Sequence, residues 1–228
     1  MTWNVKRELV PLGILIAVAV LAFLYGPGLP EQVPSHFDAE GYPDGTMPRT
    51  AFLLMISGVV VGLYVVLTFI PFIDPLWKKI QPRYNVLLLF RDLTMGFMLM
   101  MFVMNLIAVR DGRLSTMATG LGLGILFMLI GNYLPKVPRN WFFGIRSPWT
   151  MSSDEVWRRS HIVGGWCFVG AGLLIAVLSV AGVATRYLLP AILAPTVIFT
   201  AFVYPYLLFR RMQRTGRTDE PGDPEQLQ

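Results

Sequence analysis

Six long apolar segments, separated by shorter polar stretches, constrain this chain more than any other feature. Each has roughly 17 to 24 residues, enough for a helix to cross the roughly 30 Å hydrocarbon core of a bilayer. Inside lipid the backbone must satisfy its own hydrogen bonds, so these segments should be helical. The approximate spans are 9–25, 51–73, 86–109, 116–134, 162–184 and 187–209. We therefore predict an all-α integral membrane protein with six transmembrane helices.

The composition agrees with this class and argues against others. Of the 228 residues, 54% are hydrophobic and 14% are charged, whereas a soluble domain carries about 25% charged residues. The net charge of +5 is typical of the basic loops of membrane proteins, so we expect a lipid bilayer as partner and no direct contact with nucleic acid. Cys167 is the only cysteine, which excludes an internal disulfide and a thiolate metal cluster.

The distribution of Lys and Arg predicts the orientation, because basic residues gather in cytoplasmic loops. If both termini lie on one side, fourteen Lys and Arg residues fall on that side and four on the other. We predict both termini in the cytoplasm, an outer loop at 26–50 and an inner loop at 135–161. The first segment lacks a small-x-small cleavage pattern and is expected to be a retained helix. The polar tail 214–228 is expected to be disordered.

Glycines in two of the segments indicate close helix packing. Gly120 and Gly124 form a GxxxG pattern in the fourth span, which lets helices approach closely. The fifth span offers further glycines, namely Gly164, Gly165, Gly170 and Gly172. We favour packing over a glycine-lined permeation route. The short connections 110–115 and 185–186 predict two tight antiparallel helix pairs.

The outer loop concentrates prolines, acids and one histidine. Pro43-Asp44-Gly45 has the composition of a turn. His36, Asp38 and Asp44 are conceivable ligands of a divalent metal, but their spacing fits no established ligand pattern, so we favour turn chemistry and expect no metal. The other functional interpretation is a surface for an external peptide, formed by His36, Phe37, Asp38 and Asp44.

The inner loop holds three of the six tryptophans and five basic residues. Residues 152–155 have the pattern of a capping box, in which Ser152 caps a short helix and Glu155 reaches back. Val156 and Trp157 should form the apolar side of that helix. Two interpretations stay open. The loop is either an interfacial belt of Trp and basic residues or a protein-docking surface, because Trp and Arg dominate binding hot spots.

Arg91 and Asp92 are the only charges inside the predicted spans. An ionisable residue at membrane depth is by default a functional candidate. Both residues lie near the cytoplasmic end of the third span, so Arg91 can extend to the headgroups and Asp92 can pair with it. We favour a structural role for the pair.

Catalytic chemistry is hard to assemble from this chain. The predicted topology places His36 outside and His161 inside, so the two histidines cannot share a site. The sequence has no zinc-binding helix motif, no nucleophile elbow, no phosphate-binding glycine loop and no paired intramembrane acids. We predict a protein that is not an enzyme and that uses no cofactor.

Both loops resemble the SdpI-like family of bacterial membrane proteins. The inner loop is similar to that family's GNxxP…N…GIRTPWT…EVW…H signature, with Ser147 where threonine is usual. The matching positions include Asn132, Asn140, Gly144, Arg146, Pro148, Trp149, Glu155, Trp157 and His161. The outer loop resembles the P…PxHF…GxPDG element of an uncharacterised domain often found at the front of such proteins, through Pro30, Pro34, His36-Phe37, Gly41 and Pro43-Asp44-Gly45.

The resemblance implies a multi-pass protein of the cell membrane that confers immunity to a membrane-active peptide toxin. It also implies a signalling role, in which a cytoplasmic transcriptional repressor docks on the inner loop. The outer loop would meet the toxin, and the inner motif would dock the partner or lock the helix ends.

One alternative is a small transporter or flippase with a cavity lined by Arg91, Asn105 and Asn132. Another is a structural membrane protein whose inner loop only anchors the helices.

Overall fold

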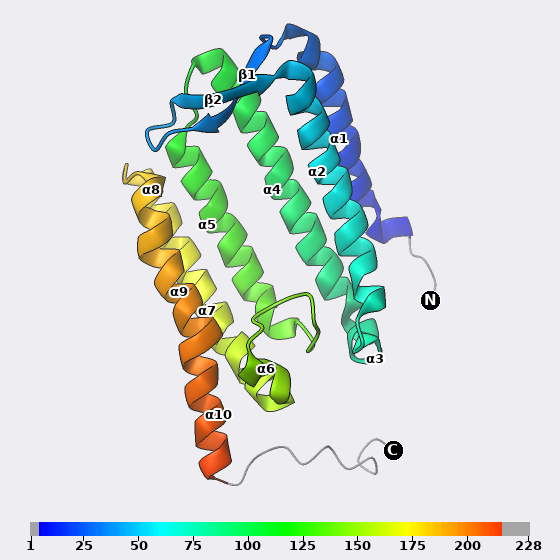
Figure 1. Cartoon of the computed structure of the whole chain (residues 1–228), viewed down its shortest axis with the longest axis vertical. Coiled ribbons are helices and arrows are strands. Elements are labelled where there is room, and N and C mark those ends of the chain that lie inside the picture. The colour runs from blue at the N-terminus through cyan, green and yellow to red at the C-terminus, as the bar shows by residue number, and fades with distance from the viewer. Residues whose placement is uncertain (1–4, 216–228) are drawn as a thin grey trace.

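Six helical segments run side by side in a computed structural model that describes residues 5–215 (Figure 1). All six are long and apolar enough to cross a membrane, which confirms the predicted fold class. Their bounds are Leu9–Gly28, Arg49–Ile73, Trp77–Asp111, Thr116–Lys136, Asp154–Val180 and Arg186–Arg214. In Figure 1 the first segment begins at about mid-height and runs towards the hairpin, and the last segment ends at the bottom, opposite the hairpin. The tail predicted to be disordered lies, beyond Thr215, outside the described residues.

The bundle consists of two groups of helices. In the first, α1 (Leu9–Tyr25), α2 (Arg49–Phe69) and α4 (Tyr84–Asp111) surround a core of buried apolar side chains from all three. In the second, α5 (Thr116–Tyr133) packs along α7 (Asp154–Val180), and the last span lies against α7. The connection between α4 and α5 is short, as predicted, but α5 makes its most extensive contact with α7.

Glycines explain the close packing of α5 on α7. A Cβ atom added to Gly124 would lie 2.5 Å from the carbonyl oxygen of Gly172, and one added to Gly131 would lie 2.6 Å from that of Gly165. The backbones can approach this closely only because neither helix has a side chain at these crossings. The packing role expected for the glycines is therefore observed at Gly124, Gly164, Gly165 and Gly172, whereas an added Cβ at Gly170 would meet nothing within 4 Å.

The last span is irregular because it contains prolines. It runs through α8 (Thr185–Leu188), a π-helical turn at Leu189–Leu193, α9 (Ala194–Ile198), a second π-helical turn at Phe199–Val203, and α10 (Tyr204–Arg214). Pro190, Pro195 and Pro205 each lack an N–H group, so the regular α-helical ladder cannot continue past them.

The outer loop folds into a two-stranded antiparallel hairpin that was not predicted. Strand β1 (Gln32–Phe37) pairs with β2 (Pro43–Pro48), with irregular register around His36. Prolines are tolerated because both strands are edge strands. The predicted turn at Pro43-Asp44-Gly45 is wrong, since these residues lie in β2. The chain instead reverses at 38–42, where Gly41 has a φ of +89°.

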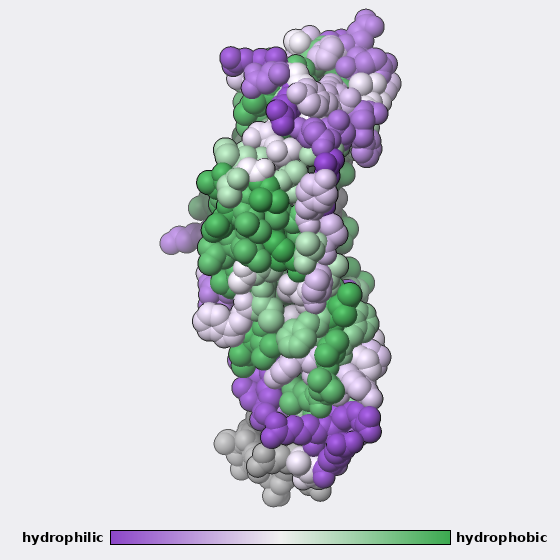
Figure 2. Space-filling model, turned by 90° about the vertical axis from the view of Figure 1, so that its left-hand side faces the viewer, coloured by the Kyte–Doolittle hydropathy of each residue, from purple (hydrophilic) through white to green (hydrophobic). Residues whose placement is uncertain are grey.

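The surface of the bundle suits a bilayer. Figure 2 shows apolar side chains over the middle of one face and polar side chains at both ends. Large apolar residues are exposed on the spanning helices, among them Phe23, Leu54, Trp166 and Phe202. In water such a surface would be strongly unfavourable, whereas in lipid it is the expected exterior. The chain is a multi-pass protein of the cell membrane.

Candidate functional site

The inner loop is a folded element organised by Asn140, whose side chain is fully buried. Its Nδ2 donates to the carbonyls of Pro138 (2.8 Å) and Phe143 (3.0 Å). Its Oδ1 accepts hydrogen bonds from the N–H groups of Phe142 and Phe143. One amide thus satisfies four backbone groups of an irregular segment, which explains why the loop needs an asparagine here.

His161 on α7 fixes the next part of the loop. Its Nε2 accepts a hydrogen bond from the N–H of Ile145 (3.1 Å), and its Nδ1 lies 2.9 Å from the carbonyl oxygen of Trp157. A carbonyl can only accept, so the ring hydrogen is assigned to Nδ1 and the imidazole is neutral. Gly144 has a φ of +93°, and a Cβ at this position would collide with His161.

Trp157 completes the buried side of the motif. Its ring stacks on the His161 ring with centroids 4.0 Å apart, and its Nε1 donates to the carbonyl of Val137 (2.9 Å). Trp157 and Val156 are buried, as predicted for the apolar side of this helix. A single turn of α7 therefore supplies both rings that hold the loop.

Capping in the loop differs from the prediction. The reciprocal capping box is formed by Ser147 and Thr150 and starts α6 (Pro148–Ser152), with Pro148 as its first residue. Ser153, not Ser152, caps α7 by accepting from the N–H of Val156 (3.3 Å). The capping roles predicted for Ser152 and Glu155 are wrong.

The two residues have other partners in the structure. Ser152 closes α6 by donating to the carbonyl of Trp149 (2.9 Å). Glu155 pairs with Arg158 (2.8 Å) and Arg159 on α7. The predicted short helix is also not separate, because α7 runs from Asp154 to Val180 without a break.

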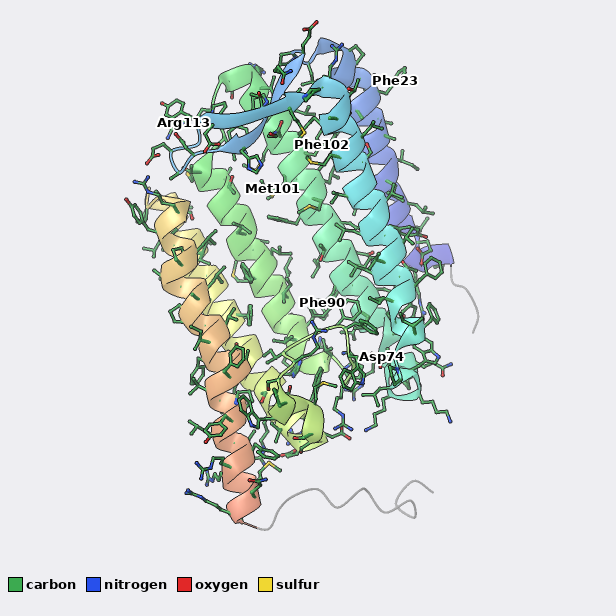
Figure 3. All side chains as sticks on the ribbon, viewed as in Figure 1. Phe23, Asp74, Phe90, Met101, Phe102 and Arg113 are labelled. Carbon is green, nitrogen blue, oxygen red and sulfur yellow. The ribbon has the colours of Figure 1, made fainter. Side chains whose placement is uncertain are left out.

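Asp74 connects the inner loop to the first group of helices. Its Oδ2 accepts from the N–H of Trp141 (2.7 Å) and its Oδ1 from the N–H of Leu76 (2.7 Å). Figure 3 shows Asp74 and Phe90 beside this loop. The sequence analysis missed Asp74, although a lone acid between an apolar span and a basic stretch is a usable signal. Around it, one apolar cluster combines both groups of helices, namely Ile80, Tyr84, Leu87, Leu88, Leu134, Val137, Ile145 and Trp157.

The remaining motif residues lie at the surface. Asn132, Arg146 and Pro148 are exposed, and the Trp149 ring lies 5.2 Å from the Tyr206 ring of α10. Arg146 donates to the carbonyl of Trp141, whose own side chain is 52% exposed. The motif therefore has a buried part that holds the helices and an exposed part, which includes Trp141, Arg146 and Pro148.

Arg91 and Asp92 belong to a buried ionic cluster at the same end of the bundle. Arg91 is fully buried, and its Nη1 lies 3.0 Å from Glu8 Oε2 and 2.9 Å from Thr68 Oγ1. Its Nε pairs with Asp92 (2.9 Å). Tyr64 donates to the same Glu8 oxygen (3.1 Å). The expected Arg91–Asp92 pair is present, and Glu8 is a partner that the sequence analysis missed.

The polar groups named for a transport cavity do not lie together. Arg91 and Asn105 are fourteen positions apart on α4, which is about 21 Å along a helix axis at about 1.5 Å per residue. Arg91 is enclosed by its partners, Asn105 lies beneath the hairpin, and Asn132 is exposed near the end of α5. This arrangement does not favour the transporter alternative.

The four predicted outer-loop residues have different environments. Asp38 closes the hairpin turn, with its Oδ1 accepting from the N–H groups of Glu40 (2.9 Å) and Tyr42 (2.8 Å). The side chains of His36 and Asp44 are exposed, and Phe37 is half-buried. Among residues 5–215, no group of three or more His, Cys, Asp or Glu side chains is placed to hold a metal ion.

The hairpin is anchored to the helices below it. The carbonyl of Gly41 accepts from the N–H of Leu114 (2.8 Å), and Glu40 forms an ion pair with Arg186. Beside these contacts is a groove of about 350 Å³, lined by Phe37, Asp38, Leu114 and Arg186 among others. The hairpin end thus presents a fixed, partly polar groove.

Six spanning helices, a hairpin over one end and a folded loop across the other define a multi-pass membrane protein. Comparison with known proteins relates two parts of the chain to known families. Residues 136–208 match the SdpI/YfhL protein family, and residues 13–61 match a domain of unknown function (DUF1648). Residues 136–208 include most of the inner motif, and residues 13–61 include the whole hairpin.

One relative extends the match over most of the chain. The immunity protein SdpI of Bacillus subtilis (strain 168) is 21% identical over 178 residues, which cover 76% of this chain and 82% of that protein. No solved structure matches the chain. The chain is similar to SdpI-like membrane proteins, and the resemblance drawn from its inner loop is confirmed. The SdpI immunity family is not known for an enzymatic activity.

Proposed function

We propose that this protein protects its cell from a membrane-active peptide by binding the peptide at the hairpin end, which faces outward. The observation that carries the proposal is the groove beside the rigidly anchored hairpin, at the end opposite the buried motif. The relative that is named as an immunity protein supports the same assignment. The protein acts by binding and is neither an enzyme nor dependent on a cofactor.

The orientation in this proposal follows from charge. The loop and helix ends at the motif end carry most of the basic residues, including Lys78, Lys79, Arg158, Arg159 and Arg210. Basic residues favour the cytoplasmic side, where anionic headgroups attract them. The termini therefore lie in the cytoplasm, and the hairpin meets peptides that arrive from outside.

For the inner motif, we propose that bracing is its first role. Asn140, Trp157 and His161 use their polar groups within the loop and are buried, so they have no surface for a partner. Docking of a cytoplasmic repressor is a second role, restricted to the exposed part around Trp141, Arg146 and Pro148. An exposed tryptophan beside an arginine is the usual composition of a binding hot spot.

Gene deletion tests the protective role. The deletion strain, exposed to conditioned medium of its parent culture, should lose membrane potential and viability, and the wild-type gene should restore both. A variant with His36→Ala and Asp44→Ala should restore less than wild type, because both side chains are exposed on the hairpin. Glu31→Ala, exposed but outside the strands, is the control. Equal survival of the deletion strain and its parent would remove the immunity assignment.

Docking at the motif end needs a separate test. Purified protein in nanodiscs would be used to capture repressor candidates encoded beside its gene, and Trp141→Ala should abolish capture without changing the melting temperature. Trp166→Ala, at an exposed tryptophan within a span, is the control. Capture that is the same with Trp141→Ala as with wild type argues for a motif that only braces the helices.

A further inference from the structure

A second, smaller pocket lies directly beneath the hairpin, next to the groove. Its volume is about 150 Å³. Phe37 of β1, Phe52 of α2 and Phe102 of α4 form aromatic walls, and Met101 and Leu114 add apolar surface. Figure 3 shows Met101 and Phe102 on the part of α4 just below the hairpin. The pocket is thus built from elements that the hairpin brings together.

Asn105 and Ser35 supply the polar side chains of this pocket, and Asn105 is the more informative of the two. Its Nδ2 donates to the carbonyl of Pro34 (3.0 Å), which fixes the orientation of the amide because that carbonyl can only accept. Its Oδ1 has no hydrogen-bond partner among the described residues, although Asn105 is only 9% exposed. A buried acceptor without a partner is unfavourable and is rare in native proteins. The acceptor therefore points to a ligand with a hydrogen-bond donor.

The size and walls of the pocket restrict that ligand further. In another protein, an apolar cavity of about 150 Å³ binds benzene, so this pocket has room for at least one aromatic ring. The rings of Phe52 and Phe102, with centroids 6.0 Å apart, offer the tilted contacts that aromatic rings prefer. A ring that carries an N–H or O–H group would satisfy both the walls and Asn105.

The neighbouring groove provides room for the chain to which such a ring is attached. The pocket and the groove share Phe37 and Leu114, and the groove adds polar side chains, namely Asp38, Thr116, Thr119 and Arg186. Groups of both charges and hydroxyls suit the polar backbone of a peptide. An acyl chain would leave the Asn105 acceptor unsatisfied.

We propose that the pocket binds a tryptophan or tyrosine side chain of a peptide that reaches the hairpin end, with its N–H or O–H donated to Asn105 Oδ1. This proposal rests on the proposed function, which says where the peptide comes from. It adds the side chain by which the protein recognises that peptide. The binding of the side chain itself can be measured without any toxin, so the two proposals can fail separately.

The test uses fluorinated indoles and the full chain in nanodiscs, followed by ¹⁹F NMR. 5-Fluoroindole should bind saturably, with empty nanodiscs correcting for partition into lipid. 5-Fluoro-1-methylindole lacks the N–H group and should bind about tenfold more weakly, as expected for the loss of one buried hydrogen bond. 5-Fluoro-3-methylindole keeps the N–H and has the same size, so it should bind like the parent. Equal binding of the two methylated isomers overturns the proposal.

Variants connect the measurement to the pocket. Asn105→Leu should remove the difference between the two methylated isomers. Ile56→Trp, which fills the pocket from α2, should abolish binding of all three indoles. Val59→Trp, on the lipid-exposed side of α2, should leave binding unchanged. If Asn105→Leu does not fold, two comparisons still test the proposal. One is binding of the three indoles to the wild-type protein, and the other is binding to Ile56→Trp against binding to Val59→Trp.

Two further outcomes also overturn the proposal. Displacement of 5-fluoroindole by oleate would show that the pocket takes a lipid chain. Binding no stronger than to empty nanodiscs would show that water alone meets Asn105. If indole binding is saturable and depends on the N–H group, but the deletion strain survives as well as its parent, the proposed pocket site is supported and the immunity role is removed.

Discussion

His161 shows how a titratable side chain at this membrane–water boundary is used for structure. Both ring nitrogens are occupied within the protein, and the ring lies between Trp157 and the glycine turn of the loop. The sequence alone predicts that His161 and His36 lie apart and cannot share a site. Its contact with Ile145 could not, because the conformation of an irregular loop is not encoded by periodicity.

We expect His161→Phe to lower the free energy of unfolding by about 1–3 kcal/mol, because the buried N–H of Ile145 loses its acceptor. His161→Gln places an amide oxygen near the position of Nε2 and should cost clearly less. Thermal and denaturant unfolding in detergent would compare the two variants, with the exposed Trp166→Phe as control. Equal loss in both variants would mean that ring packing, not the hydrogen bond, holds the loop.

At the scale of elements, the sequence predicts where each spanning helix runs but not which elements pack against one another. Hydropathy defines where each helix runs, because the bilayer demands about 20 apolar residues. The hairpin was missed since its strands contain Pro34, Pro43 and Pro48, which lower strand propensity, and its stability comes from the helices beneath it. Glycine spacing indicated close packing but could not show that α5 packs on α7.

The α5–α7 crossing yields a clear prediction. Gly124→Leu should lower the free energy of unfolding by more than about 3 kcal/mol or prevent folding, because a Cβ there already meets the backbone of Gly172 at 2.5 Å. Gly170→Leu, on the same pair of helices with nothing within 4 Å of an added Cβ, should change stability by about 0.5 kcal/mol or less. Steric-trapping or detergent unfolding measurements would separate them. Similar behaviour of the two variants would contradict this crossing.

The Glu8–Arg91 pair ties the start of α1 to α4. We expect Glu8→Leu to destabilise by roughly 3 kcal/mol, because it leaves a fully buried guanidinium with Asp92 as its main counter-charge. The double variant Glu8→Leu with Arg91→Met should regain part of this loss, as apolar replacements of buried pairs often do. A double-mutant cycle of unfolding free energies would give the coupling. Strict additivity would show that the two groups do not interact in the membrane.

At the scale of the whole molecule, the two groups of helices are joined at both ends by different means. At the hairpin end, the contacts are Gly41 with Leu114 and Glu40 with Arg186. At the motif end, they are Asp74 with Trp141 and Lys79 with Asp154. Such long-range pairs join segments far apart in sequence. They depend on the final packing and cannot be read from one sequence.

Asp74 is the clearest test of this architecture, because one carboxylate accepts from backbone N–H groups on both sides of the junction. A hydrogen bond to a charged acceptor is worth about 1.5–3 kcal/mol, so Asp74→Ala should speed amide exchange at Trp141 at least about tenfold. Exchange in the hairpin, at the opposite end, should stay unchanged if the two junctions are independent. Asp111→Ala, at an exposed acid of α4, is the control for hydrogen–deuterium exchange in nanodiscs. Faster exchange in both the inner loop and the hairpin would mean instead that the two ends open together, so that a peptide bound outside could alter the exposed surface formed by Trp141, Arg146 and Pro148.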